Sequence, residues 1–372
     1  MNYNTQQHNT DAINAAIIGA AGYAGAELTR LLLSHPRFSL KIISSQSLRG
    51  QRLADVYPAF QGVSNLFFSE HDILPFIKDE DVKLVFLAVP HTTAMNVAPE
   101  LLAQGVSVVD LSADFRLKDA DTFEKWYDEK HSCPQLLEQV VFGLPELYPK
   151  DFSLAAKRVA DKKQVLVSCA GCYPTASSLA AFPAMPFKKE DADVVVNAIS
   201  GVSGAGRSAN STTHFCNANE NIRAYSVGCH RHTPEISQIL DANDQVVFVP
   251  HLSPVNRGIL STVCMRIDKE KFCKVFGSKC TIDSVCAYYK DFYKGCEFIR
   301  VLDVGKQAQT SSVLGTNYAH ISLAKSANGN NLIVTCAIDN LCKGAAGQAV
   351  QCANLVYGLP ESLGLEMQAL PV

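Results

Sequence analysis

The stretch AAIIGAAGYAG, residues 15–25, decides the fold of the first half of this chain. Its apolar beginning, Ala15 to Ile18, is too short for a helix and predicts a buried strand. Residues 27–34 predict a helix, and residues 38–43 predict a second strand. A strand, a glycine turn, a helix and a strand within about 30 residues are typical of a dinucleotide-binding unit, in which a pyrophosphate lies against the helix N-terminus.

The glycine spacing is G-x-x-G-x-x-G rather than G-x-G-x-x-G. Glycines alone are also typical of a plain tight turn, but the flanking strand and helix favour a cofactor site. The residues expected to approach the pyrophosphate are Gly19, Gly22, Tyr23, Ala24 and Gly25.

The end of the second strand predicts which nicotinamide cofactor binds. An NAD site usually places an acid there, but none occurs between Glu27 and Asp55. The strand instead ends in Ser44 and Ser45, and Arg49 follows. Hydroxyls and a guanidinium suit a 2′-phosphate, so we predict NADP. The alternative for the arginines of this loop is that they are solvated.

The later strands indicate two kinds of sheet. Short apolar runs and helices alternate up to about residue 170, which predicts a parallel, doubly wound sheet. Strands with fewer helices between them follow, which predicts a largely antiparallel sheet. The fold class is therefore α/β. A Rossmann-type NADP-binding domain is expected over 12–171, completed by a C-terminal helix within 343–372, and an α+β catalytic and dimerisation domain over 172–342. Residues 1–11 are predicted to be a flexible tail.

The stretch SCAGCYPT, residues 168–175, predicts a nucleophile. It follows an apolar strand, and Pro174 marks the first turn of a helix. Cys172 thus lies at a helix N-terminus, where free N–H groups and the helix dipole stabilise a thiolate. The alternative is a small buried hydrophobic residue, which is the commoner use of cysteine.

Residues 229–236, CHRHTPEI, predict a general acid or base. His230 and His232 precede a helix that is expected to begin near Glu235, and histidine titrates near neutral pH. A structural zinc site built from Cys169, Cys172 and this segment is the alternative. The ligand spacing does not fit a zinc finger, so no metal is predicted.

A small-residue loop, SGVSGAGRS over 200–208, follows another predicted strand. Exposed backbone N–H groups that end in Arg207 are typical of an anion cradle. The alternative is a flexible connector, which does not require the arginine.

Composition excludes several classes of partner. The net charge of -3 gives no basic field for nucleic acid, and no apolar run approaches the ~20 residues that span a bilayer. The polar first residues lack a signal core, and 13 cysteines scattered over 372 residues do not form a disulfide framework. A cytoplasmic location is expected.

In their order and spacing, these motifs resemble the N-acetyl-gamma-glutamyl-phosphate reductases, the arginine-biosynthesis members of a semialdehyde dehydrogenase group. The resemblance runs from about Ala15 almost to the end of the chain. It implies NADPH-dependent reduction of an acyl phosphate through a cysteine thioester, in a homo-oligomer (dimer or tetramer).

The resemblance also implies residue roles. Cys172 matches the nucleophile, and the acid/base falls in the His-Arg-His segment, where His232, oriented by Glu235, is favoured over His230. Asn340 and Lys343 match the cofactor side of the cleft. The residues expected to bind substrate are Arg116, Ser203, Arg207 and Arg257.

One departure from the family pattern is Ala170, where a proline is common before Gly-Cys; this loosens the turn without removing a chemical group. Two alternatives to the reductase stay open at this point. One is a sibling enzyme acting on aspartyl or N-acetyl-aminoadipyl phosphate. The other is a non-enzymatic NADP-binding regulator, against which intact Cys172 and His232 argue.

Overall fold

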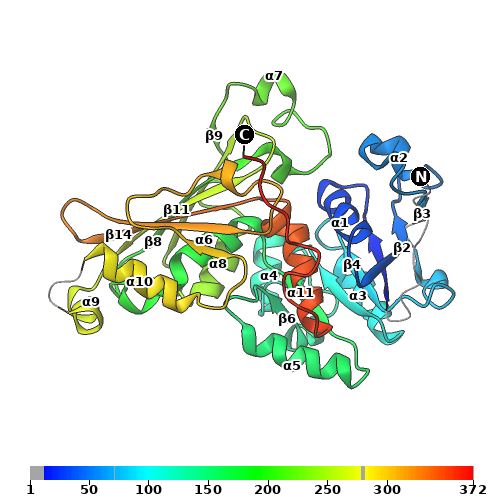
Figure 1. Ribbon diagram of the computed structural model, residues 1–372, viewed down its shortest axis with the longest axis horizontal. Helices are drawn as coiled ribbons and strands as arrows, with labels where there is room; N and C mark the ends of the chain where they lie inside the picture. The colour runs from blue at the N-terminus through cyan, green and yellow to red at the C-terminus, as the bar shows by residue number, and fades with distance from the viewer. Residues whose placement is uncertain (1–11, 71, 278–280, 372) are drawn as a thin grey trace.

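The protein contains two seven-stranded sheets that lie side by side along the long axis of the molecule (Figure 1). The computed structural model describes residues 12–70, 72–277 and 281–371. The predicted tail, residues 1–11, lies outside these described residues. Among them, no helix is both long and apolar enough to cross a bilayer.

The first sheet has the order β3-β2-β1-β4-β5-β7-β6, and every strand pair in it is parallel. This confirms the α/β prediction for the first half. The strands are β1 (Ile13–Ile18), β2 (Phe38–Ser44), β3 (Phe68–Ser69), β4 (Leu84–Leu87), β5 (Ser107–Asp110), β6 (Val141–Gly143) and β7 (Leu166–Cys169).

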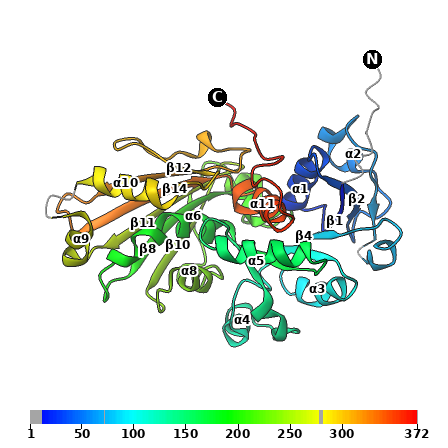
Figure 2. The same cartoon turned by 60° about the horizontal axis from the view of Figure 1, so that its bottom comes forward.

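Both faces of the first sheet are covered. Because strand side chains alternate, Ala15 and Ile17 enter one apolar cluster while Ala16 and Ile18 enter another. The first cluster contains α1 (Tyr23–Leu33), α5 (Pro149–Ala160) and α11 (Gly347–Val356), and the second contains α3 (Ala94–Ala103) and α4 (Ala120–Tyr127). Figure 2 shows α1 and α4 on opposite sides of the sheet.

Helix α1 begins at Tyr23, four residues before the predicted start at Glu27. Gly22 is the N-cap, in extended conformation, and no side chain caps the helix. The glycine turn thus leads directly into the helix, and its first N–H groups stay available for a ligand.

The second sheet has the order β12-β13-β14-β11-β8-β10-β9. It is mixed rather than purely antiparallel, because β8 pairs with β10 and β12 pairs with β13 in parallel. The strands are β8 (Val194–Gly201), β9 (Arg223–Ala224), β10 (Val246–Ser253), β11 (Ile259–Arg266), β12 (Ile299–Val301), β13 (Ala319–Lys325) and β14 (Asn331–Ile338).

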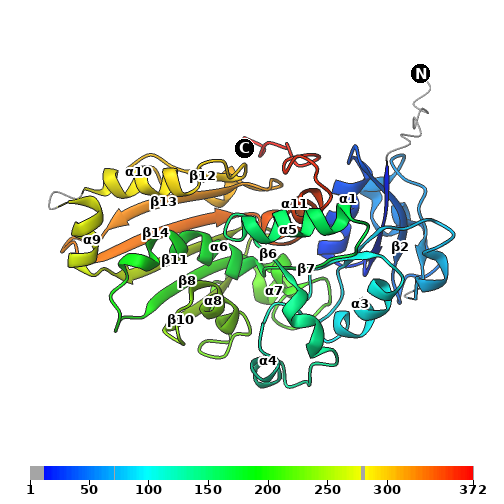
Figure 3. The same cartoon turned by 90° about the horizontal axis from the view of Figure 1, so that it is seen from below.

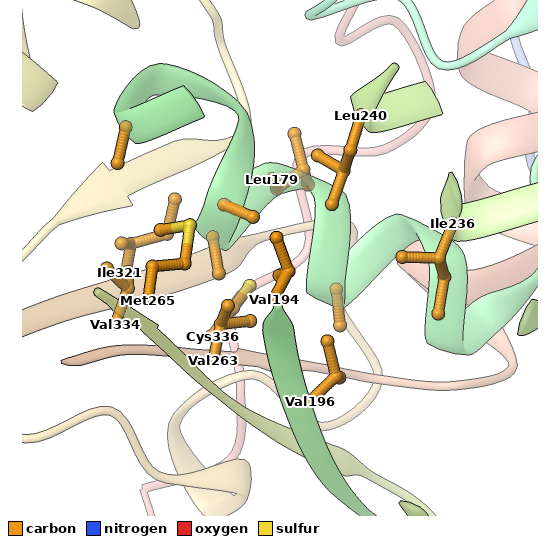
Figure 4. Packing of buried hydrophobic residues seen from close by; sticks show 14 of the residues in the cluster. Leu179, Val194, Val196, Ile236, Leu240, Val263, Met265, Ile321, Val334 and Cys336 are labelled. Atoms are coloured by element: carbon orange, nitrogen blue, oxygen red, sulfur yellow. The ribbon is translucent and has the colours of Figure 1, made fainter. Parts of the chain in front are cut away.

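Helices cover one face of this second sheet (Figure 3). They are α6 (Cys172–Ala181), α8 (Thr233–Leu240), α9 (Lys269–Phe276) and α10 (Ile282–Phe292). In Figure 4, Leu179 of α6 packs near Val194 and Val196 of β8, within one apolar cluster. The opposite face exposes Ile199 and Val247, which are 37% and 43% accessible.

The chain returns to the first domain at its end. After β14, a π-helix over Cys342–Ala346 continues into α11, which packs against α1 and α5.

Two short helices lie in loops. Helix α2 (Leu53–Val56) lies near the glycine turn, and helix α7 (Phe215–Ala218) lies above the second sheet (Figure 1).

Candidate active site

A cavity of about 1400 Å³ lies between the glycine turn of the first domain and the start of α6. The loop over 200–208, the segment 225–232 and residues 340–345 contribute further walls. Among its described lining residues are three arginines and three histidines, and none is Asp or Glu. A cavity of this charge favours anionic ligands.

Cys172 is the first residue of α6, with Gly171 as the N-cap, as the sequence predicted. The packing is close, because a Cβ added to Gly344 would lie 2.7 Å from Cys172 Cβ. Burial raises the pKa of the Cys172 thiol to about 11, although Arg116 and the Tyr173 N–H act to lower it. The resting group is therefore a thiol, and forming the thiolate requires a base.

Hydrogen bonds to two backbone carbonyls fix Arg116 next to the N-terminus of α6. Its Nε donates to Cys169 O at 2.8 Å, and its Nη2 donates to Leu111 O at 2.7 Å. Its Nη1 lies 3.4 Å from His232 Nε2. The buried guanidinium thus places one positive charge next to both Cys172 and His232.

His232 lines the cavity at the N-cap of α8. A Cβ on Gly171 would lie 2.6 Å from His232 Nε2, so the imidazole lies directly against the start of α6. Burial, reinforced by His230, Arg116 and His91, lowers the pKa of His232 well below its usual value. A neutral imidazole at this position can accept a proton.

His230 is held differently. Its Nδ1 accepts the backbone N–H of His232 at 3.1 Å, and its ring makes edge contacts with Tyr173, Tyr225 and Phe248. Burial and the nearby Arg231 lower the pKa of His230 to about 4. These contacts favour a positioning role for His230.

Glu235 does not orient His232 as predicted. Its Oε1 accepts the Gly171 N–H at 2.8 Å, and its Oε2 lies 3.6 Å from Arg116 Nη1. Among the described residues, His232 Nδ1 has no hydrogen-bond partner. Burial raises the pKa of Glu235 against the opposing effects of Arg116 and the Gly171 N–H. Glu235 thus fixes the helix start and the arginine.

The glycine turn has the shape that a dinucleotide needs. A Cβ on Gly19 would lie 2.3 Å from Ala88 O, and one on Gly25 would lie 2.5 Å from Gly19 O. A Cβ on Gly22 would meet only open space and Gly19 O at 3.8 Å. With the uncapped start of α1, this opening fits a pyrophosphate. All five predicted residues of the turn line the cavity.

Comparison with known proteins agrees with this arrangement. Residues 14–155 match the semialdehyde dehydrogenase NAD binding domain, and residues 172–340 match the semialdehyde dehydrogenase dimerisation domain. The N-acetyl-gamma-glutamyl-phosphate reductase of Desulforamulus reducens is 40% identical over 363 residues, which cover 96% of this chain and 99% of that protein. The reductase of Syntrophobacter fumaroxidans is 42% identical over 359 residues, covering 95% and 98%.

This chain belongs to the N-acetyl-gamma-glutamyl-phosphate reductase family. Solved structures of more distant proteins share the fold. Aspartate semialdehyde dehydrogenase II of Vibrio cholerae, complexed with ASA, superimposes with a TM-score of 0.65 at 15% identity, covering 93% of this chain and 98% of the other. The NADP-bound aspartate semialdehyde dehydrogenase of Candida albicans gives a TM-score of 0.64 with the same identity and coverage.

Within this reductase fold, several predicted site residues do not line the cavity. Arg49 is exposed and lies 3.3 Å from the carboxylate of Glu70, so its charge is already paired. Ser44 is buried behind Ser45, which does line the cavity. Neither Arg49 nor Ser44 is among the lining residues, and their predicted contact with the 2′-phosphate stays a prediction.

Two basic residues assigned from the resemblance form ion pairs instead. Lys343 is fully buried, and its Nζ lies 2.6 Å from Glu146 Oε1. Arg257 lies 3.1 Å from both Glu27 and Asp339. Both are corrections to the predicted contacts with cofactor and substrate, because the two side chains are bound by carboxylates outside the cavity lining.

The remaining predicted residues lie at the cavity. Asn340 Nδ2 donates to Ser203 Oγ at 2.9 Å, and Asn340 Oδ1 accepts the Gly258 N–H, which ties the loop over 200–208 to the end of β14. Arg207 was expected to bind substrate but instead contacts the glycine turn, because its Nη1 donates to Ala21 O at 3.0 Å.

Sequence reasoning missed several cavity residues, among them His91, Tyr127 and Arg231. His91 follows β4 at the carboxyl edge of the parallel sheet, where ligands bind in such folds, so its position carried a usable signal. Tyr127 ends α4, far from any motif, and no sequence signal pointed to it.

Cys169 and Cys172 lie in different surroundings. Cys169 is buried in the first-domain core and makes a thiol contact with Cys352 of α11, whereas Cys172 packs against the second core. Among the described residues, no group of three or more His, Cys, Asp or Glu side chains is arranged to hold a metal ion.

Proposed function

We propose that this protein reduces N-acetyl-gamma-glutamyl phosphate to N-acetyl-glutamate semialdehyde and phosphate with NADPH, a step of arginine biosynthesis. The observation that carries the proposal is the position of Cys172. It begins α6 in a cavity whose described lining residues include no Asp or Glu, with His232 and Arg116 next to it and the glycine turn in the same cavity wall. Near-full-length similarity to the reductases supports the substrate assignment.

Cys172 acts as the nucleophile. Because burial keeps Cys172 as a thiol and His232 as a neutral imidazole, the proton passes from the sulfur to His232 only as the sulfur–carbon bond forms. The sulfur–carbon bond forms, the bond from that carbon to the phosphate oxygen breaks, and phosphate leaves as the hydrogen phosphate ion, with its proton supplied by solvent. Arg116 stabilises the negative charge that develops beside Cys172.

Reduction then takes place at the thioester on Cys172. The bound cofactor supplies the hydride. The resulting thiohemiacetal collapses, the carbon–sulfur bond breaks, and the semialdehyde leaves. His232 returns its proton to the Cys172 sulfur, which restores the resting pair.

The cofactor site is assigned to the glycine turn and the loop that follows β2. Ser45, Gln46 and Ser47 line the cavity there, and none of them would repel a 2′-phosphate. Arg207 stacks over Tyr57 at 5.1 Å and supplies the positive charge on this side. Arg207→Ala should raise the Kd for NADPH about tenfold, whereas Arg49→Ala should change it less than about threefold.

The reverse reaction tests the function. Purified protein is supplied with NADP⁺, phosphate and a panel of semialdehydes: N-acetyl-glutamate, aspartate and N-acetyl-aminoadipate semialdehyde. We expect NADPH formation to be fastest with the first and to depend on phosphate. A higher kcat/KM for another semialdehyde would assign the protein to a sibling reaction.

Cys172→Ser tests the covalent step. It should lower turnover at least a hundredfold, about 3 kcal/mol in activation free energy, while NADPH binding persists. Turnover above this limit would contradict the thioester mechanism.

We also propose that the enzyme is a cytoplasmic homo-oligomer, a dimer or tetramer. The match to a dimerisation domain and the exposed face of the second sheet with Ile199 and Val247 support this assembly. Sedimentation equilibrium at several concentrations measures it, and a monomer at micromolar concentration would contradict it.

A further inference from the structure

The three arginines of the cavity lie in different places. Arg116 is buried behind Cys172, and Arg207 contacts the glycine turn at Ala21. Arg231 instead lies 5.2 Å from the ring centroid of Tyr127, the last residue of α4. Arg231 thus belongs to the part of the cavity wall next to the end of α4, whereas Arg207 contacts the glycine turn.

The Arg231 side chain is exposed to the cavity, and stacking on Tyr127 positions its guanidinium. Its neighbours along the chain are anchored, since His230 Nδ1 accepts the His232 N–H and His230 O accepts the Thr233 N–H. Among the ion pairs of the described residues, none involves Arg231, whereas Arg257 has two carboxylate partners. A guanidinium without a carboxylate partner, in a cavity whose described lining residues include no Asp or Glu, is suited to bind a carboxylate in bidentate geometry.

His91 adds a donor beside this guanidinium. Its ring meets the Tyr127 ring edge-on at 5.5 Å, and its Nδ1 accepts the Ala113 N–H at 3.2 Å. The ring proton therefore lies on Nε2. The next residue, Thr92, has φ +69°, a strained conformation for a β-branched residue, and Asp114 binds its N–H at 2.7 Å. The fold thus maintains a strained turn that presents His91 to the cavity.

We propose that Arg231, stacked on Tyr127 and assisted by His91, binds the α-carboxylate of the substrate. The inference rests on the proposed function. The acyl phosphate must lie at Cys172, where Arg116 is the adjacent cation. The other charged group of N-acetyl-gamma-glutamyl phosphate is the carboxylate at the far end of the glutamyl chain, and Arg231 is the remaining arginine among the described lining residues.

The separation of Cys172 and Arg231 consequently determines which length of substrate chain fits the site. Arg231 is fixed by the second domain and Tyr127 by the first, while Cys172 is fixed by α6. A shorter aspartyl or longer aminoadipyl chain cannot place its carboxylate at Arg231 and its acyl carbon at Cys172 equally well. Selection among these substrates thus follows from the Cys172-to-Arg231 span.

Steady-state kinetics of the reverse reaction test the proposal. Arg231→Ala should raise the KM for N-acetyl-glutamate semialdehyde roughly 10- to 100-fold, while the KM for phosphate and the Kd for NADPH stay within about threefold. Tyr127→Leu, which removes the stacking surface, should raise the same KM by a smaller factor. Arg223→Ala, on the exposed strand β9, is the matched control and should leave all three constants unchanged.

The α-amide of the semialdehyde separates charge recognition from a structural effect. The wild-type enzyme should favour the acid over the amide in kcat/KM, and Arg231→Ala should treat both alike. Equal losses for acid and amide, or a raised KM for phosphate, would overturn the proposal. Arg231→Gln removes the charge while keeping a long polar side chain, and it provides the same comparison if the alanine variant does not fold. Absence of phosphate-dependent activity in the wild type would instead reject the proposed function.

Discussion

A single methyl group at Gly171 should disable the acid/base pair without harming the fold. Gly171 has φ −64° and ψ 159°, a conformation that alanine adopts freely. The new Cβ would lie 2.6 Å from His232 Nε2 and 2.9 Å from Arg116 Nη1. Ordinary van der Waals contact begins near 3.4 Å, so the imidazole must retreat by about 0.8 Å.

That displacement sets the size of the effect. A misplacement near 1 Å in a catalytic group costs about a hundredfold, so Gly171→Ala should lower kcat roughly 30- to 100-fold, or about 2–2.7 kcal/mol in activation free energy. The assay is phosphate-dependent NADPH formation from N-acetyl-glutamate semialdehyde. The free energy of unfolding should change by less than about 2 kcal/mol, because the substitution also lowers the entropy of the unfolded chain.

A double-mutant cycle identifies the cause. If the methyl group acts by displacing the imidazole, adding Gly171→Ala to His232→Asn should cost at most a fewfold in kcat. A full 30-fold loss in that background, or wild-type activity in the single variant, would refute the reasoning.

Three further predictions concern residues around the same cleft. His232→Asn should lower turnover by about 10²–10⁴, more than His230→Asn, and the opposite order in steady-state assays would move the acid/base role to His230. Because burial raises the pKa of Cys172 to about 11, inactivation of the free enzyme by iodoacetamide should accelerate about tenfold per pH unit from about pH 7 to 9. A plateau below about pH 8 would show that the thiolate is already formed. Lys343→Met should lower the free energy of unfolding by about 3–5 kcal/mol in urea titrations, since it leaves Glu146 buried and unpaired. Adding Glu146→Leu should recover most of that loss, and failure to recover it would show that packing rather than charge is responsible.

The features that sequence predicted well are local ones. The glycine turn and the helix start at Cys172 each depend on a few neighbouring residues, so their backbone conformations could be predicted from the sequence. The α/β class followed from the alternation of apolar runs and helical segments, which is likewise a local pattern.

The errors concern partners that only the folded chain brings together. Arg257 pairs with Glu27, 230 positions earlier, and no spacing rule encodes that contact. Glu235 was expected to orient His232, one helical turn away, yet its carboxylate is bound by the Gly171 N–H, 64 positions earlier. In both cases tertiary contacts decided the side chain's role.

The location of α11 has a consequence for how the protein is made. The π-helix that supports Cys172 at Gly344, and the helix that closes the first-domain core, both come from the last 31 residues of the chain. During synthesis the first domain therefore leaves the ribosome without part of its core, and contacts of long sequence separation fold slowly. The apolar core of the first domain therefore stays incompletely covered while the entire second domain is translated. Chaperone dependence should accordingly be concentrated in this window, and it should be reduced in a circular permutant that begins with the final helix.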